Sequence, residues 1–160
     1  FEKDDLSNFN DKSFNNHINI NLKAPAVLTQ GFKKYLKLKK GLIINIIDQR
    51  VFKLTPFFFS YTLSKTGLQT LTKTSAMSLA PNIRVNGIAP GPTIKNKRQT
   101  EKHFKKQWKS LILKNKVNPK NICETVKYFI INDNVTGQIL SVDSGQSLAW
   151  ETPDIINTKE

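Results

Sequence analysis

Apolar residues along this chain follow two patterns: helical spacing over long segments, and nearly continuous short runs. A spacing of three to four residues predicts helices, whereas a short apolar run predicts a strand, and the continuous run at residues 42–47 predicts one covered on both faces. We expect helices at residues 9–39, 60–79 and 118–131. We expect strands at residues 42–47, 83–88 and 139–142.

Punctuating residues separate these segments. Pro25 predicts an irregularity inside the first helix, Pro81 ends the second, and Asn118 followed by proline opens the third. Residues 48–58 form a loop by this criterion, and residues 93–118 are polar, basic and unassigned. The alternation of helices and strands predicts an α/β fold, with a parallel sheet between helices.

Two stripes of side chains predict how the later helices pack. In the second helix one stripe runs through Leu63, Gly67, Leu71, Ser75 and Leu79. In the third helix the predicted inward stripe holds Ile122, Val126, Phe129 and Ile130. Both stripes have the spacing of one helix face.

The composition fits a single folded domain. The 160 residues are 38% hydrophobic, which disfavours disorder, and no apolar run is long enough to cross a bilayer. Residues 1–5 have neither a basic region nor an apolar segment, so we expect no secretory signal there. A single cysteine, Cys123, excludes an internal disulfide and fits a reducing compartment, so we expect a cytoplasmic protein without a membrane partner.

The formal charge of +13 could attract polyanions, but its distribution argues against a dedicated role. Lysine, asparagine and isoleucine are frequent along the whole chain. The basic runs show no regular aromatic interleaving, no zinc-ligand spacing and no recognition-helix pattern. We therefore expect no metal site and no specific nucleic-acid partner.

Candidate chemistry gathers at the expected carboxyl ends of the strands, where parallel sheets bind their ligands. Asp48 follows the first strand, and Pro90 and Gly91 follow the second. Tyr61 and Lys65 lie four residues apart at the start of a helix, so they share one face. A nearby ammonium lowers a tyrosine pKa and makes the phenol a usable general acid. Alone, such a pair is more often an ordinary surface pair.

The surrounding motifs resemble the short-chain dehydrogenase/reductase family. Its G-x-I-x-N-I strand is matched by residues 41–46, its Y-x-x-x-K motif by residues 61–65, and its R-V-N-x-I-x-P-G motif by residues 84–91. Residues 135–145 are similar to its T-G-Q and V-D-G-G ending, with Ser144 in place of a glycine. The blocks follow the family's order over most of the chain.

The resemblance implies roles for individual residues. Tyr61 would protonate the reduced substrate, while Lys65 would hold the nicotinamide ribose of NADPH or NADH. Asn21 would order a water that relays protons, unless it only satisfies helix backbone groups. Gly91 and Thr93, with the backbone near Pro90, would border the nicotinamide. The implied partner is a small-molecule substrate.

Asp48 departs from the family, in which most members have serine thirteen residues before the tyrosine. A carboxylate opposes the negative charge that grows on a carbonyl oxygen, but it can help to protonate a ring nitrogen. Asp at this position is similar to pteridine reductases and dihydromonapterin reductase-like members. We therefore expect reduction of a pterin C=N bond. The open alternatives are that Asp48 only caps a loop, and that the substrate is a carbonyl compound or alcohol.

The family's glycine-rich phosphate loop has no counterpart in this sequence. The resemblance places Phe1 just after the family's fourth strand, so residues 1–160 would form a single incomplete NAD(P)-binding domain: the C-terminal part of a Rossmann-type, doubly wound parallel sheet. The strand at residues 42–47 would then present an open apolar edge. A truncated gene product, a split gene and a shortened chain are all compatible with this expectation.

Independent turnover by such a chain is expected to be weak or absent, unless a separate N-terminal polypeptide supplies the first strands. The resemblance also implies self-association into a homo-oligomer. A different class of function stays open: a non-catalytic remnant, or a basic protein that binds polyanions through its charge.

Overall fold

The computed structural model describes residues 3–152. Helices and strands alternate along the chain in the order that the sequence predicts. The elements are α1 (Asp11–Ile18), a π-helical turn (Asn19–Lys23), α2 (Ala24–Tyr35), β1 (Gly41–Ile46), α3 (Phe59–Leu79), β2 (Ile83–Pro90), α4 (Glu101–Lys109), α5 (Pro119–Ile131) and β3 (Ile139–Val142), with 3-10 turns at Gln49–Val51 and Gln146–Leu148.

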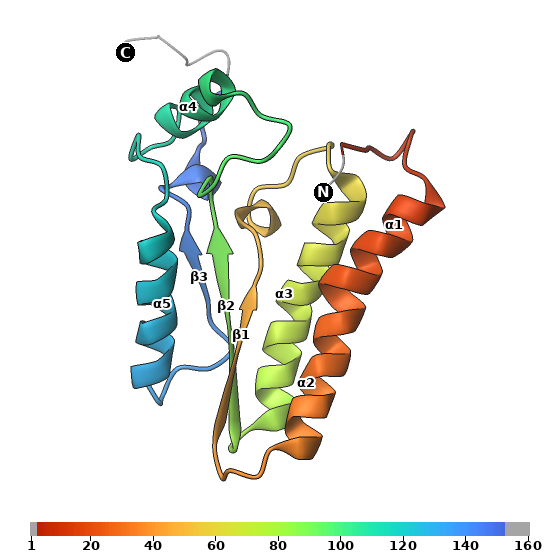
Figure 1. The fold of residues 1–160 in the computed structure, drawn as a ribbon, viewed down its shortest axis with the longest axis vertical. Coiled ribbons are helices and arrows are strands. Elements are labelled where there is room, and N and C mark those ends of the chain that lie inside the picture. The colour runs from red at the N-terminus through yellow and green to blue at the C-terminus, as the bar shows by residue number, and fades with distance from the viewer. Residues whose placement is uncertain (1–2, 153–160) are drawn as a thin grey trace.

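The three strands form one parallel sheet in the order β1-β2-β3. Gly41 pairs with Ile83 at one end of the β1–β2 ladder, and Gly87 pairs with Ile139 where β3 joins. Helices α1, α2 and α3 lie on one side of the sheet and α5 on the other (Figure 1). This three-layer α/β/α arrangement confirms the predicted fold class.

The centre of the core is β2, because helices cover both of its faces. Val85, Ile88 and Ala89 are fully buried. On the α3 side, Leu68 packs with Ala89, and Ala76 packs with Val85. Within residues 3–152, β1 pairs only with β2, so its other edge is open, as the sequence predicts.

The expected irregularity at Pro25 takes the form of a π-helical turn at Asn19–Lys23, which separates α1 from α2. Proline has no N–H to donate and its ring crowds the carbonyl four residues earlier, so a widened turn before it relieves both conflicts. The helix ends at Tyr35 rather than at residue 39, because Leu36 turns to an extended conformation.

The stripe predicted for α3 contacts more than one neighbour, and the inward stripe predicted for α5 needs a correction. Leu63 is 44% exposed, and the side chains that α3 buries toward the sheet include Leu68, Thr72 and Ala76. The predicted stripe is divided: a Cβ at Gly67 would lie 2.7 Å from the Leu22 side chain, whereas Leu71 and Leu79 pack against the core clusters at the sheet. In α5 Phe129 is fully buried, but Ile130 is 56% exposed, so its place in the inward stripe was wrong.

The segment that the sequence left unassigned contains the short helix α4. Thr100 caps it, since its side-chain oxygen accepts a hydrogen bond from the His103 N–H. Phe104 is the buried residue of this helix. Most other residues of this helix are charged or polar, so the spacing of apolar residues does not predict it.

Replacing Phe129 with Ala should lower the free energy of unfolding by about 3–5 kcal/mol, because the ring is fully buried and its loss leaves a cavity. Ile131, which is 77% exposed at the end of the same helix, supplies the control. We expect Ile131→Ala to change stability by less than about 0.5 kcal/mol in urea denaturation. Equal losses in the two variants would contradict this account of the core.

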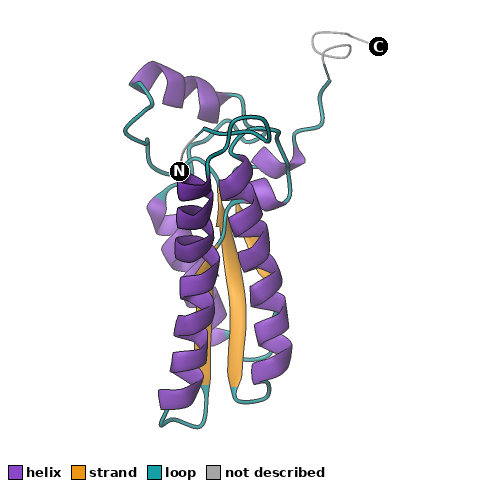
Figure 2. Ribbon diagram, turned by 90° about the vertical axis from the view of Figure 1, so that its right-hand side faces the viewer, coloured by secondary structure: helices purple, strands orange, loops and turns teal. Residues whose placement is uncertain are grey.

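Most of the loops gather beyond the carboxyl ends of the strands, at the upper end of Figure 2. This end carries the segments after β1 and β2 together with α4. None of the helices within residues 3–152 has the length and apolar character that crossing a membrane requires.

Candidate active site

Tyr61 and Asp48 meet at the carboxyl end of β1. Asp48 lies two residues after the end of this strand, and Tyr61 lies in the first turn of α3. The Tyr61 hydroxyl donates a hydrogen bond to Asp48 Oδ2 at 2.9 Å. The other carboxylate oxygen, Oδ1, accepts the Arg50 N–H at 2.9 Å. Both oxygens therefore act as acceptors, which suits an ionised carboxylate.

The pKa of Tyr61 is raised, not lowered as the sequence predicts. Burial is the largest cause, and the charge and hydrogen bond of Asp48 add to it, while Arg50 acts in the opposite direction. A carboxylate beside a phenol disfavours phenolate. The prediction considered the ammonium on the same helix face but not the carboxylate opposite the hydroxyl.

Lys65 lies one helical turn after Tyr61 and points to the open edge of the sheet. Its Nζ donates to the carbonyl oxygen of Ile46 at 2.9 Å and lies 5.9 Å from the centroid of the Tyr61 ring. Burial lowers the pKa of Lys65, and the charge of Asp48 acts in the opposite direction. The ammonium is thus held beside the tyrosine ring by a backbone carbonyl.

Asn21 lies in the π-helical turn and faces α3, the helix that carries Tyr61 and Lys65. Its Nδ2 donates to Ser64 Oγ at 3.1 Å. Asn21, Tyr61 and Lys65 line one cavity of about 420 Å³. The structure brings these three predicted residues together, and the contact with Ser64 is compatible with both readings of Asn21.

Pro90, Gly91 and Thr93 line a second cavity, of about 710 Å³, together with Asp48. Gly91 approaches the chain after β3 so closely that a Cβ there would lie 2.7 Å from the Asp143 Cα. The Thr93 hydroxyl donates to the Gly91 carbonyl at 3.0 Å. The Tyr61–Asp48 hydrogen bond joins the two cavities, because Tyr61 lines one and Asp48 the other.

Several residues that line the larger cavity carry no signal in the sequence. They come from the loop around Arg98 and from α4, which contributes His103. The Arg50 guanidinium lies 4.5 Å from the centroid of the Phe58 ring. Only the fold brings these separate segments to one place.

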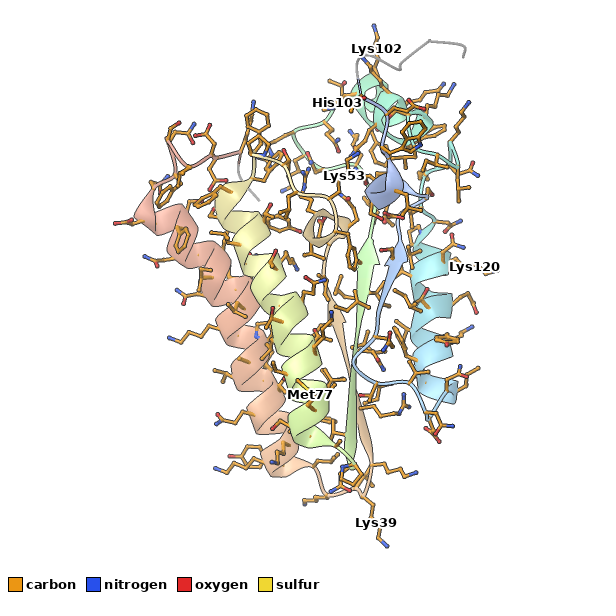
Figure 3. All side chains as sticks on the ribbon, turned by 180° about the vertical axis from the view of Figure 1, so that it is seen from behind. Lys39, Lys53, Met77, Lys102, His103 and Lys120 are labelled. Carbon is orange, nitrogen blue, oxygen red and sulfur yellow. The ribbon has the colours of Figure 1, made fainter. Side chains whose placement is uncertain are left out.

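Lysines within residues 3–152 project from several sides of the fold (Figure 3). Lys39 projects from one end of the fold, Lys102 from the opposite end, and Lys120 from the side that carries α5 (Figure 3). Lys53 is engaged by the chain itself, since its Nζ donates to the Ala149 carbonyl at 2.8 Å. Residues 3–152 contain no group of three or more His, Cys, Asp or Glu side chains arranged to hold a metal ion.

Comparison with known proteins agrees with this geometry. A family profile described as enoyl-(acyl carrier protein) reductase matches residues 2–147. The short-chain dehydrogenase/reductase homolog YusR of Bacillus subtilis is 34% identical over 113 residues, which cover 70% of this chain and 88% of that protein. Dihydromonapterin reductase of Enterobacter sp. is 27% identical over 81% of this chain and 55% of its own length.

A similar solved structure is that of FolM alternative dihydrofolate reductase 1 from Brucella canis, complexed with NADP. It superposes with a TM-score of 0.94 at 46% sequence identity and covers 97% of this chain. This chain spans 62% of that protein, and a little over half of the Enterobacter reductase. The profile match, the identity to YusR and the shared fold agree, and the chain belongs to the short-chain dehydrogenase/reductase family.

Proposed function

We propose that this chain carries the catalytic centre of an NADPH-dependent reductase that acts on a pterin-type C=N bond. The observation that carries the proposal is the 2.9 Å hydrogen bond from the Tyr61 hydroxyl to Asp48 Oδ2. The names of two similar proteins, dihydromonapterin reductase and alternative dihydrofolate reductase, point to the same substrate class.

The pairing of a phenol with a carboxylate suits reduction of C=N better than reduction of C=O. When a carbonyl accepts hydride, negative charge grows on its oxygen, and a carboxylate in contact with the site opposes that charge. When a ring C=N accepts hydride, the nitrogen must gain a proton. Tyr61 can donate that proton, and Asp48 can bind the protonated ring or help to return a proton to the phenol.

The residues present fit the nicotinamide end of a dinucleotide. Pro90, Gly91 and Thr93 line the larger cavity at the end of β2, and Lys65 presents an ammonium next to Tyr61. The 160 residues contain no glycine-rich loop of the kind that binds a pyrophosphate. When bound, NADPH supplies the hydride.

The proposed roles follow from the positions of the side chains. Tyr61 holds and delivers a proton at its hydroxyl, and Lys65 binds the nicotinamide ribose and places a positive charge beside the phenol. Asn21 orders a water near Lys65 in the cavity that both line. Pro90, Gly91 and Thr93 border the nicotinamide.

The proposal includes partners of two kinds. The open edge of β1 is suited to pairing with further strands, supplied by the same protein or by a separate polypeptide. On α2 the side chains of Val27, Leu28 and Tyr35 are each more than half exposed, which favours self-association of this helix. The full activity depends on the first of these partners.

Substrate competition tests the proposed function. The protein, with any residues that naturally precede Phe1, is assayed for NADPH oxidation with dihydrobiopterin and with a simple ketone at equal concentrations. We expect the rate with the pterin to exceed the rate with the ketone at least tenfold. Faster ketone reduction would overturn the pterin assignment, and binding to polyanions without detectable NADPH binding would overturn the enzyme assignment.

A further inference from the structure

A buried chain of three polar side chains lies next to Tyr61. His17 on α1 is 7% exposed, Ser60 at the start of α3 is fully buried, and Asp4 is 6% exposed. The distance from His17 Nδ1 to Ser60 Oγ is 2.7 Å. The Ser60 hydroxyl in turn donates to Asp4 Oδ2. Buried polar groups are costly unless hydrogen bonds satisfy them, so this chain needs an explanation.

The direction of the hydrogen bonds excludes a nucleophilic serine. Ser60 has one hydroxyl hydrogen, and Asp4 Oδ2 accepts it. The serine oxygen must therefore accept a hydrogen bond from His17, which places a proton on Nδ1. A serine nucleophile needs the reverse, a histidine nitrogen that accepts the hydroxyl proton, and an oxygen that a substrate can reach. The chain is suited to holding parts of the fold in place.

Asp4 replaces the missing cap of α3. Phe58, which precedes this helix, has left-handed backbone angles and makes no side-chain capping bond. The Asp4 carbonyl accepts the N–H groups of Phe58 at 2.7 Å and Phe59 at 3.4 Å. Its carboxylate accepts the Ser60 N–H at 3.3 Å. Residues far apart in sequence thus fix the first turn of the helix that carries Tyr61.

Two hydrogen-bonded pairs join α3 to α1 and the π-helical turn, which lie beside it (Figure 1). His17 contacts Ser60, and Asn21 donates to Ser64; both pairs are 43 residues apart. The His17 ring also meets the Tyr61 ring edge-on, with centroids 5.9 Å apart and planes at 75°. His17 therefore holds both the residue before Tyr61 and the Tyr61 ring itself.

We propose that His17, Ser60 and Asp4 are positioning residues that hold the Tyr61 hydroxyl against Asp48. They act through the first turn of α3 and through the edge of the Tyr61 ring. Their importance for turnover rests on the proposed function, in which Tyr61 delivers a proton. Their effect on the position of Tyr61 does not depend on which substrate is reduced.

Two readouts test the proposal in the protein with any residues that naturally precede Phe1. The first is the pH titration of the Tyr61 phenol, followed by NMR of 13C-labelled tyrosine and assigned with Tyr61→Phe among the three tyrosines. The second is kcat and KM for pterin reduction. In His17→Leu we expect the Tyr61 titration to move down toward the ordinary tyrosine range. We expect kcat to fall at least tenfold while KM stays within about twofold.

Conservative and matched variants separate positioning from general destabilisation. His17→Asn keeps an N–H donor near the place of Nδ1, so it should restore the titration and bring kcat to within about threefold of the wild type. Ser60→Ala, a second way to break the chain, should act like His17→Leu. The control is Thr72→Val, which removes another buried contact of α3, the hydrogen bond from Asn45 to Thr72 at 2.9 Å. It should leave the Tyr61 titration unchanged.

The outcomes are distinct. An unchanged Tyr61 titration in both His17→Leu and Ser60→Ala, an equal shift in Thr72→Val, or no rescue by His17→Asn would each overturn the positioning proposal. Asp48, Lys65 and Arg50 are chemically unchanged in all these variants, so a shift in the Tyr61 titration reports a change in the position of Tyr61 relative to them. If the wild type reduces no pterin, the proposed function fails while the titration still decides the positioning role.

Discussion

Replacing Tyr61 with Phe should lower kcat for pterin reduction by about 10²- to 10⁴-fold, the range that positioned general acids contribute. The substitution removes the hydroxyl that donates to Asp48 Oδ2 and keeps the ring that meets His17 edge-on. Substrate and cofactor should therefore bind with KM values within a few-fold of the wild type. The measurement is steady-state oxidation of NADPH.

Tyr128→Phe is the matched control, because this tyrosine lies on α5 and is 43% exposed. It should leave kcat unchanged. A Tyr61→Phe enzyme that retains more than a tenth of the wild-type kcat would contradict the assignment. The proton would then come from another group, of which Asp48 is the nearest carboxyl on the structure.

Replacing Asp48 with Asn should lower the pKa of Tyr61, because two of the causes that raise it are the charge of Asp48 and its hydrogen bond. Burial remains, so the pKa should stay above its ordinary value. The acid form of Tyr61 is lost as pH rises through its pKa. Because the variant has a lower pKa at Tyr61, the alkaline limb of its kcat profile should move to lower pH. Phenolate absorbance and the pH profile of kcat measure the two effects.

The same variant should reduce pterin turnover at neutral pH by about 10²-fold, if Asp48 takes part in protonation of the ring nitrogen. Asp48→Ser, which restores the residue of most family members, should lose pterin reduction while the relative rate with ketones rises. Pterin activity that survives both substitutions would show that Asp48 only caps the loop through the Arg50 N–H, the open alternative.

The order of elements could be predicted because local patterns carry it. Asn118 predicts the start of α5, and its side-chain oxygen does accept the Lys120 N–H. The run at residues 83–88 predicts a strand, and in β2 Val85 and Ile88 are fully buried. The run at residues 42–47 predicts a strand covered on both faces, whereas Ile46 of β1 is 48% exposed. In contrast, α4 was missed because its cap and its single buried residue, Phe104, give too weak a pattern.

The candidate site was predicted in part. Tyr61 and Lys65 share a helix face by spacing alone, and the resemblance pointed to Asp48, Asn21 and Gly91. Spacing along the chain does not predict which atoms form hydrogen bonds with one another. The Tyr61 hydroxyl faces a carboxylate that raises its pKa, whereas the sequence predicts a lowered value from the neighbouring ammonium.

His17 and Asp4 show most clearly which contacts the sequence alone does not predict. A helix-face spacing of four residues from His17 to Asn21 was visible in the chain, but it had no partner until α3 lay beside it with the same spacing from Ser60 to Ser64. The capping of α3 by Asp4 joins residues 56 positions apart. No local pattern encodes such contacts, because they depend on how separate elements pack.

The sequence by itself determined the alternation of helices and strands, the parallel sheet and the family motifs, since each depends on residues near one another in the chain. The tertiary structure alone decided which atoms meet: Tyr61 with Asp48, Lys65 with the Ile46 carbonyl, and His17 with Ser60. Proton affinity depends on burial and on charges a few ångströms away, and those distances exist only after the elements have packed.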